Sequence, residues 1–199
     1  MPTSNTIKQI GLELGFQKIG ITDANLDKQH ANYRQWIARN FHGEMGYMAR
    51  NIDKRLHPAE LVPDTLSVIC VRLDYLVKEQ QDPLQLLDHD KLAYLSRYAL
   101  GRDYHKLMRK RLQRFADRIT EVFGHMGYRV FTDSAPVLEK ALATKAGIGW
   151  QGKHSNLLHR EHGSWFFLGE IYTDMQLEVD TPLDNHCGRC RSCIDICPT

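Results

Sequence analysis

The chain has 199 residues, of which 42% are hydrophobic and 25% are charged, and its formal net charge is only +2. This composition predicts a folded domain with its own core and excludes a disordered or fibrous chain, while the small net charge indicates no particular partner. There is no run of eighteen apolar residues and no apolar segment within residues 1–8. We therefore expect neither a membrane span nor a signal peptide, and a cytoplasmic location.

The first half of the chain alternates short helices and strands. Its predicted elements are helices over 5–14 and roughly 28–40 and strands over 18–22 and 66–73. Cys70 lies inside the apolar strand 66–73, so it is predicted to be buried rather than a ligand. The polar stretch 80–91 contains Pro83 and is predicted to be a surface excursion.

The second half contains the longest predicted helix, over 102–123, with an apolar face. After it we expect a strand over 128–133, a helix over 137–146, a glycine-rich loop over 147–155 and a strand over 165–173. Helices and strands are mixed along the chain, which predicts a three-layer α/β (α+β) domain.

The long helix carries basic residues at every fourth position. They are Arg102, Lys106, Lys110, Arg114 and Arg118, with Arg109 and Arg111 beside them. At about 1.5 Å of rise per residue the stripe spans about 24 Å, which is long enough to follow a phosphate backbone. The alternative is the solvated face of an amphipathic helix, and the stripe alone favours that alternative.

Two further stretches have a chemical and a plain interpretation. Asp133 ends a predicted strand, where α/β proteins place ligands. The alternative is that it caps the next helix, and its position alone slightly favours this cap. The loop 147–155 could approach a phosphate or a large planar cofactor, or be an ordinary surface loop. The scattered histidines have no spacing that demands a metal; they are His105, His154, His159 and His162.

Four cysteines lie close together near residue 199, with the spacing C-x2-C-x2-C-x3-C-P. They are Cys187, Cys190, Cys193 and Cys197. This is the ferredoxin spacing for a four-iron four-sulfur cluster, in which the first three cysteines ligate one cube and the fourth ligates a second one. Structural zinc is the alternative, although zinc sites usually pair two C-x2-C units across a longer gap. We therefore predict a domain over 1–180 and the start of a two-cluster ferredoxin domain over 181–199, in the front part of a longer protein.

Together these motifs resemble the N-terminal half of bacterial epoxyqueuosine reductases. The resemblance covers nearly the whole chain and rests on DKRLHP at 53–58, RYALGRDYH at 97–105, DSAPVLE at 133–139, AGIGWQGKHS at 146–155, GSWFFLGE at 163–170 and the cysteine run. It implies reduction of epoxyqueuosine to queuosine at the wobble position of tRNA, the last step of queuosine synthesis. It also implies a cobalamin-binding domain, two four-iron four-sulfur clusters and a helical-repeat C-terminal part.

The resemblance assigns roles to individual residues. It implies that Asp133 is the proton donor, and its implied cobalamin contacts are Arg55, Ser96, Asp133, Leu157 and Leu168. The implied partners are a tRNA that carries epoxyqueuosine and an unidentified electron donor, with no membrane and a monomeric enzyme.

The implied chemistry is consistent with the residues. Removing an epoxide oxygen needs two electrons and two protons, and a carboxylic acid kept protonated by burial can supply a proton. A tRNA substrate also gives the basic helix a partner.

Two other classes of protein stay open from the sequence: a ferredoxin-like electron carrier and a zinc-stabilised RNA-binding module.

Overall fold

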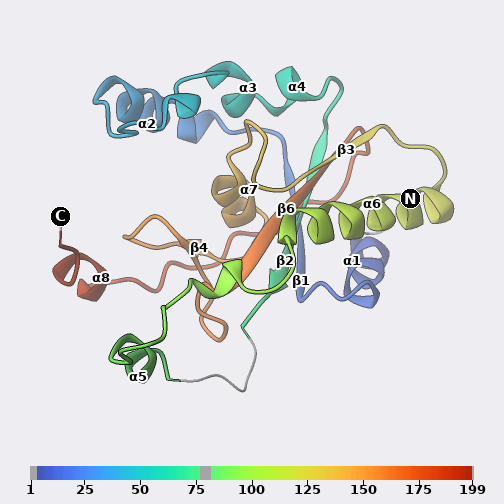
Figure 1. Ribbon diagram of the computed structural model, residues 1–199. Helices are drawn as coiled ribbons and strands as arrows, with labels where there is room; N and C mark the ends of the chain where they lie inside the picture. Colours follow the sequence, from blue (N-terminus) through green and yellow to red (C-terminus); the bar gives the residue numbers. More distant parts are fainter. Residues whose placement is uncertain (1–3, 77–81, 199) are drawn as a thin grey trace.

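The computed structural model describes residues 4–76 and 82–198, and it is built around one antiparallel sheet (Figure 1). The strand order is β1-β2-β6-β3. The strands are β1 (Lys18–Asp23), β2 (Ser67–Asp74), β6 (Phe166–Thr173) and β3 (Tyr128–Phe131). The two central strands, β2 and β6, are eight residues each and are almost entirely buried, which explains why their apolar runs predict them so clearly.

Alternation along β2 divides the core between the two faces of the sheet. Ile69 and Val71 face α1 (Ser4–Glu13) and α6 (Tyr104–Phe123), whereas Val68 and Cys70 face α7 (Glu139–Lys145). The apolar face of α6, including Met108, Leu112 and Phe115, packs completely buried against the first face. The predicted three layers and the buried position of Cys70 are confirmed.

The sheet has no parallel pair among the described strands, so the fold is α+β. The expectation that Asp133 ends a strand at a ligand site used a rule for α/β sheets with parallel strands, and that rule does not apply to this antiparallel sheet. Asp133 instead lies two residues beyond β3, in the turn that leads to α7.

Shorter elements surround the α7 face. They are α2 (Asp27–Ala38), η1 (Gly46–Met48), α3 (Ile52–Leu56), α4 (Pro58–Leu61), η2 (Arg97–Ala99), the hairpin of β4 (Trp150–Gln151) and β5 (Leu157–Leu158), and α8 (Ser192–Asp195). The predicted polar excursion contains a helix, α5 (Pro83–Leu87), while Gln80 and Gln81 lie outside the described residues. None of the helices described here is long and apolar enough to cross a membrane.

Candidate active site

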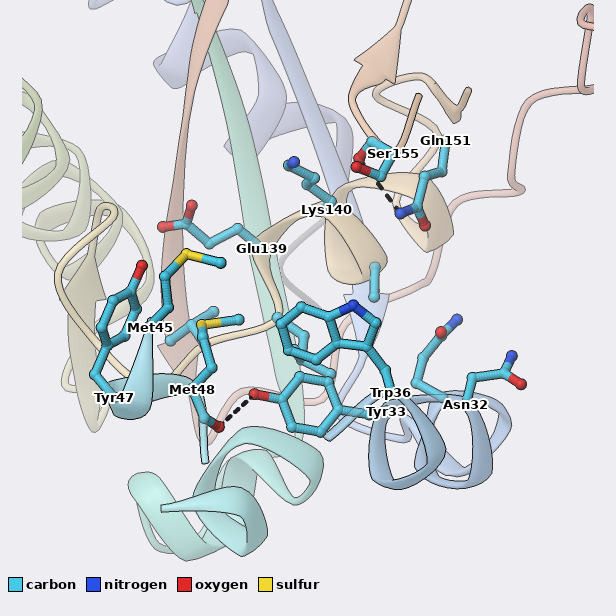
Figure 2. A pocket seen from close by; sticks show the side chains of 14 residues that line it. Asn32, Tyr33, Trp36, Met45, Tyr47, Met48, Glu139, Lys140, Gln151 and Ser155 are labelled. Atoms are coloured by element: carbon cyan, nitrogen blue, oxygen red, sulfur yellow. Dashed lines mark hydrogen bonds between the residues drawn. The ribbon is translucent and has the colours of Figure 1, made fainter. Parts of the chain in front are cut away.

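A cavity of about 570 Å³ opens between α2, η1 and α7 (Figure 2). Tyr33 and Trp36 of α2 form one wall, Met48 of η1 extends it, and Glu139 and Lys140 of α7 lie opposite. The hydroxyl of Tyr33 donates a 2.8 Å hydrogen bond to the carbonyl oxygen of Met48, which ties α2 to η1. The cavity combines aromatic and thioether walls with polar groups at its rim, as sites for large organic ligands do.

A second cavity, of about 240 Å³, adjoins the first because Lys140 lines both. Its walls combine the polar residues Lys140, Asn156 and Ser164 with aromatic and apolar ones, namely Tyr75, Tyr98, Tyr104, Leu157, Phe166, Phe167 and Leu168. The ring of Tyr104 stacks on that of Phe167, with centroids 4.0 Å apart and an interplanar angle of 6°. The two cavities together make one extended groove along the N-terminal half of α7.

Asp133 lines neither cavity but contacts a lining residue of each. Its carboxylate oxygen Oδ2 accepts a hydrogen bond from the hydroxyl of Tyr104 at 2.5 Å and lies 3.0 Å from Nε2 of His105. Its backbone N–H donates to Oε1 of Glu139 at 2.5 Å. Tyr104 lines the second cavity and Glu139 the first, so Asp133 is held from both sides.

The backbone of Asp133 is in the left-handed region, with φ of 59°. Aspartate and asparagine tolerate this conformation better than most residues. The capping interpretation is wrong, because the N-cap of α7 is Leu138 and no side chain caps that helix. The Asp133 side chain is 58% exposed in the protein alone, and its expected burial beside a bound corrin stays a prediction.

Two further carboxyl groups lie behind Asp133. Burial raises the pKa of Glu139 to about 7, and the charge of Asp133 acts in the same direction. Glu170, in the centre of β6, is fully buried, and neither of its carboxyl oxygens has a hydrogen-bond partner. Burial raises the pKa of Glu170 well above its usual value, with a further contribution from Glu139. A neutral Glu170 is therefore the form that this environment favours.

The other residues expected to contact cobalamin also lie around the groove. Leu157 and Leu168 line the second cavity directly. Arg55 is buried beneath the first cavity and donates through Nη2 to the carbonyl oxygen of Tyr47, a lining residue. Ser96 is exposed and immediately precedes η2. Leu157 and Leu168 therefore line the groove, Arg55 and Asp133 contact residues that line it, and Ser96 lies two residues before the lining residue Tyr98.

Tyr104 and His105 received no site role from the sequence. A local signal was present, because Asp103 is an N-cap residue whose carboxylate accepts from the backbone N–H of His105 at 2.9 Å. Capping fixes the start of α6 and places Tyr104 and His105 in its first turn. The contact with Asp133, however, spans 28 residues of sequence and could not be read from local spacing.

The cysteine run lies against the β4–β5 hairpin. The ammonium of Lys153 donates to the carbonyl oxygens of Gly188 at 2.9 Å and Cys190 at 2.8 Å, and the indole N–H of Trp150 points at the sulfur of Cys187 at 3.4 Å. A hydrogen bond from Ser192 lowers the pKa of the Cys190 thiol. The glycine-rich loop 147–155 therefore anchors the cysteine run.

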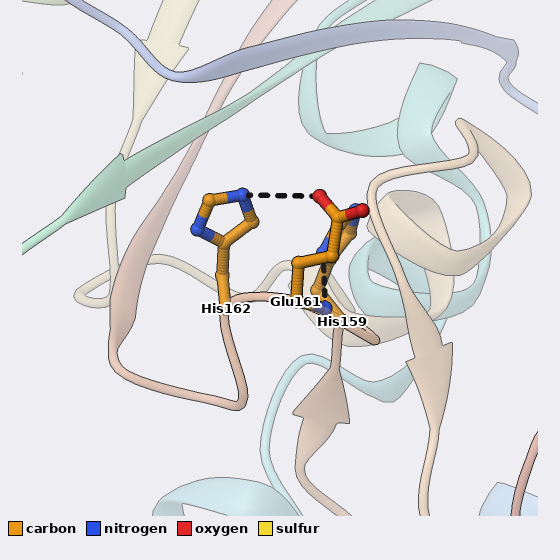
Figure 3. Close-up of side chains that lie close together, drawn as sticks. All are labelled: His159, Glu161 and His162. Atoms are coloured by element: carbon orange, nitrogen blue, oxygen red, sulfur yellow. Dashed lines mark hydrogen bonds and ion pairs between the residues drawn. The ribbon is translucent and has the colours of Figure 1, made fainter.

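A separate cluster joins His159, Glu161 and His162 in the turn between β5 and β6, with donor atoms within 4.8 Å of one another (Figure 3). The sequence spacing did not predict this cluster. Both histidines of the cluster also have partners within the protein: His162 lies 3.5 Å from a carboxylate oxygen of Asp74, and the backbone N–H of Glu161 donates to Nδ1 of His159. Burial and the charge of Arg72 lower the pKa of His159, and that positive charge also opposes a cation.

A groove of about 520 Å³ runs along the outer face of α6. It is lined by Arg102, Asp103, Lys106, Leu107, Lys110, Arg111 and Arg114. The predicted stripe is shorter than expected at its far end, because Arg118 lies 3.7 Å from Glu13 and 3.6 Å from Glu121. Acidic partners therefore compensate Arg118, whereas Lys110 and Arg114 face the groove.

Solved structures with this fold include epoxyqueuosine reductases and a reductive dehalogenase. The structure of epoxyqueuosine reductase from Streptococcus thermophilus superposes with a TM-score of 0.89 at 28% identity, covering 100% of this chain and 53% of that chain. A crystal structure of epoxyqueuosine reductase with a tRNA-Tyr epoxyqueuosine-modified stem loop gives 0.84 at 25% identity, covering 98% and 51%. A B12-dependent reductive dehalogenase shares the fold alone, with a TM-score of 0.56 at 14% identity over 94% of this chain and 22% of its own.

Sequence comparison finds relatives at higher identity. The family described as epoxyqueuosine reductase QueG, DUF1730, matches residues 55–134. The Pseudomonas aeruginosa epoxyqueuosine reductase is 54% identical over 197 residues, covering 98% of this chain and 54% of its own length, and the Escherichia coli enzyme is 51% identical over 193 residues, covering 97% and 51%. The chain is a homologue of the N-terminal half of the epoxyqueuosine reductases, and it spans about half the length of these relatives.

Proposed function

We propose that this chain is the catalytic half of a cobalamin-dependent oxidoreductase that reduces epoxyqueuosine in tRNA to queuosine. The observation that carries the proposal is the position of Asp133, whose carboxylate is held by Tyr104 and His105 and which contacts one lining residue of each cavity. A positioned acid beside a large ligand groove is what proton delivery to an epoxide oxygen requires. One related structure contains an epoxyqueuosine-modified tRNA stem loop, and in the Bacillus subtilis enzyme an aspartate-bearing catalytic loop is swung out of the active site.

The lining of the groove suits a corrinoid by its chemistry. Two adjoining cavities of about 570 and 240 Å³ offer apolar walls for a macrocycle, including Leu157 and Leu168. Side-chain amides at the rim, among them those of Asn32 and Asn156, suit the amide groups around a corrin. The Nε of Arg55 is buried without a hydrogen-bond partner, and the same side chain contacts Tyr47 of the first cavity. When bound, reduced cobalamin supplies a strong nucleophile for the epoxide carbon, and the protein orients the substrate and delivers protons.

The cysteine run is proposed to deliver the electrons. In this assignment Cys187, Cys190 and Cys193 ligate one four-iron four-sulfur cube and Cys197 ligates a second, so that 181–199 begins a ferredoxin domain after the catalytic domain 1–180. The contacts of Lys153 and Trp150 support this arrangement, since they fix the run to the same hairpin whose β5 strand provides Leu157. Electrons would then arrive beside the cofactor groove.

We place the enzyme in the cytoplasm as a monomer.

Conversion and metal content together test the proposed function. The full-length protein, purified anaerobically and supplied with cobalamin and a low-potential reductant, should convert epoxyqueuosine to queuosine in tRNA, measured by mass spectrometry of nucleosides. Elemental analysis should find iron and cobalt. Iron without cobalt, together with no conversion, would support a ferredoxin-like electron carrier instead. Zinc without iron would support a zinc-stabilised RNA-binding module.

The groove on α6 is the proposed contact for the phosphates of the tRNA. We expect the charge reversal Lys110→Glu/Arg114→Glu to weaken tRNA binding, because a phosphate that the protein no longer neutralises keeps its counterion. Each such phosphate lowers the slope of log K against log salt by about 0.7 to 0.9. Filter binding at several salt concentrations measures both the affinity and the slope. The matched control is Lys18→Glu/Lys54→Glu, which changes the charge equally at exposed positions outside the groove. Equal effects of the two double variants would assign the groove to an ordinary solvated helix face.

A further inference from the structure

The contacts of His105 determine where its protons lie. Nε2 lies 3.0 Å from Oδ2 of Asp133, and Nδ1 lies 2.8 Å from Oδ1 of Asp103. A carboxylate oxygen only accepts hydrogen bonds, so an imidazole between two carboxylates carries a proton on both nitrogens. If Asp133 itself is protonated, the same contact persists with Nε2 as the acceptor. One proton can therefore lie on either side of the contact between His105 and Asp133 without movement of the heavy atoms.

The surroundings hold this geometry. The ring of Tyr104 stacks on the imidazole of His105, with centroids 4.0 Å apart. Burial, followed by the hydrogen bond to Asp133, raises the pKa of Tyr104, so its hydroxyl remains a neutral donor. Glu139 accepts from the backbone N–H of Asp133 on the side away from His105. The nearby cationic groups are Lys106, which acts on Asp103, and Arg109, whose guanidinium lies 3.5 Å from the hydroxyl of Ser134.

The proposed reaction needs more protons than Asp133 can hold. Conversion of an epoxide to an alkene breaks two C–O bonds, forms one C=C π bond and two O–H bonds, and releases the oxygen as water. It consumes two electrons, supplied by reduced iron–sulfur clusters, and two protons. Asp133 can donate one proton when the first C–O bond breaks. A second must reach the resulting hydroxyl before it leaves as water.

We propose that His105 supplies this second proton by transferring it from Nε2 to Asp133, with Asp103 as the positioning residue that holds the imidazole. The proposal rests on the proposed function. In sequence, Asp133 donates the proton that it shares with His105 to the opened epoxide, His105 regains a proton from water and passes it from Nε2 to Asp133, and Asp133 then protonates the departing hydroxyl. The His105 side chain is 40% exposed and can recover its proton from water.

The titration of His105 agrees with this role. The hydrogen bond to Asp103, more than the one to Asp133, raises the pKa of His105 above its ordinary value, although partial burial opposes the shift. Below this raised pKa His105 is an imidazolium, so the proton relay from His105 to Asp133 has a proton to transfer. Turnover should decline as the pH rises through it, because His105 then becomes neutral.

His105→Gln separates proton transfer from a purely structural role. The glutamine amide can still donate a hydrogen bond to Asp133 but cannot exchange a proton, so a structural role predicts nearly normal turnover. The relay predicts that turnover of epoxyqueuosine tRNA by the full-length holoenzyme falls by roughly 10²-fold, within the range of a general acid. It also predicts that His105→Gln no longer shows the decline in turnover as the pH rises through the pKa of His105. Added imidazole should partly restore the turnover of His105→Ala. His125→Gln, an exposed histidine beyond α6, is the control and should leave turnover unchanged.

A second measurement does not need turnover. In the full-length protein without substrate, NMR titration of labelled histidines should give His105 a raised pKa, which Asp133→Asn and Asp103→Asn should both lower. The signal of the exposed His125, which lies outside this contact, is the internal reference. This titration also keeps the two proposals separate: if the wild-type holoenzyme forms no queuosine, the proposed function fails, while the titration still decides whether His105 and Asp133 share a proton. Wild-type turnover in His105→Gln, or a His105 pKa that Asp133→Asn leaves unchanged, would overturn the relay.

Discussion

Asp133→Asn should reduce turnover of epoxyqueuosine tRNA by roughly 10²–10⁴, the usual contribution of a general acid. Asparagine keeps the size of aspartate, tolerates the left-handed backbone at this position, and can still accept the hydroxyl hydrogen bond of Tyr104 through its amide oxygen. What it cannot do is donate a proton to an alkoxide. Binding of cobalamin and the thermal stability of the protein should therefore remain close to wild type while the chemical step slows.

The control for this variant is the same substitution at an exposed aspartate away from the groove. Asp88, at the C-cap of α5, is suitable, and Asp88→Asn should leave turnover unchanged. Turnover and thermal stability should be measured on both full-length holoenzymes. A normal rate in Asp133→Asn would remove Asp133 as the acid. It would not restore the capping role, because no side chain caps α7.

The sequence predicted the elements that carry strong periodic signals. The continuous apolar run of β2 and the amphipathic pattern of α6 were sufficient for both, with boundaries that agree within two residues. The start of α5 carried a readable signal as well, because Asp82 caps it and Pro83 occupies its first turn. The polarity of the stretch 80–91 nevertheless led to the prediction of a surface excursion without a helix.

The arrangement of the site was harder to predict, because it depends on tertiary contacts. The antiparallel order β1-β2-β6-β3 is set by connections between strands far apart in sequence, and no local pattern specifies it. Likewise, residues 147–155 were ambiguous as a loop, and only the fold shows that Lys153 and Trp150 contact the cysteine run. The buried, unpartnered Glu170 ends the motif at 163–170, where the sequence predicted no role for it.

The second large effect is expected at a glycine in the core. Gly20, in the middle of β1, lies so close to the end of α7 that an added Cβ would fall 1.9 Å from the carbonyl oxygen of Ala146. That oxygen belongs to the backbone, so no side-chain rotation can relieve the clash. The end of α7 would have to move away from the sheet, which also shifts the residues of α7 that line the groove.

Gly20→Ala should therefore destabilise the protein by about 3 kcal/mol or more, the upper part of the range for overpacked cores. At about 2–4 °C per kcal/mol for a domain of this size, the midpoint of thermal unfolding should fall by roughly 6–12 °C. Gly46→Ala is the matched control, because an added Cβ there meets no atom within 4 Å. Circular dichroism melting of both variants measures the difference. Equal midpoints would mean that α7 does not pack against β1 as closely as the structure shows.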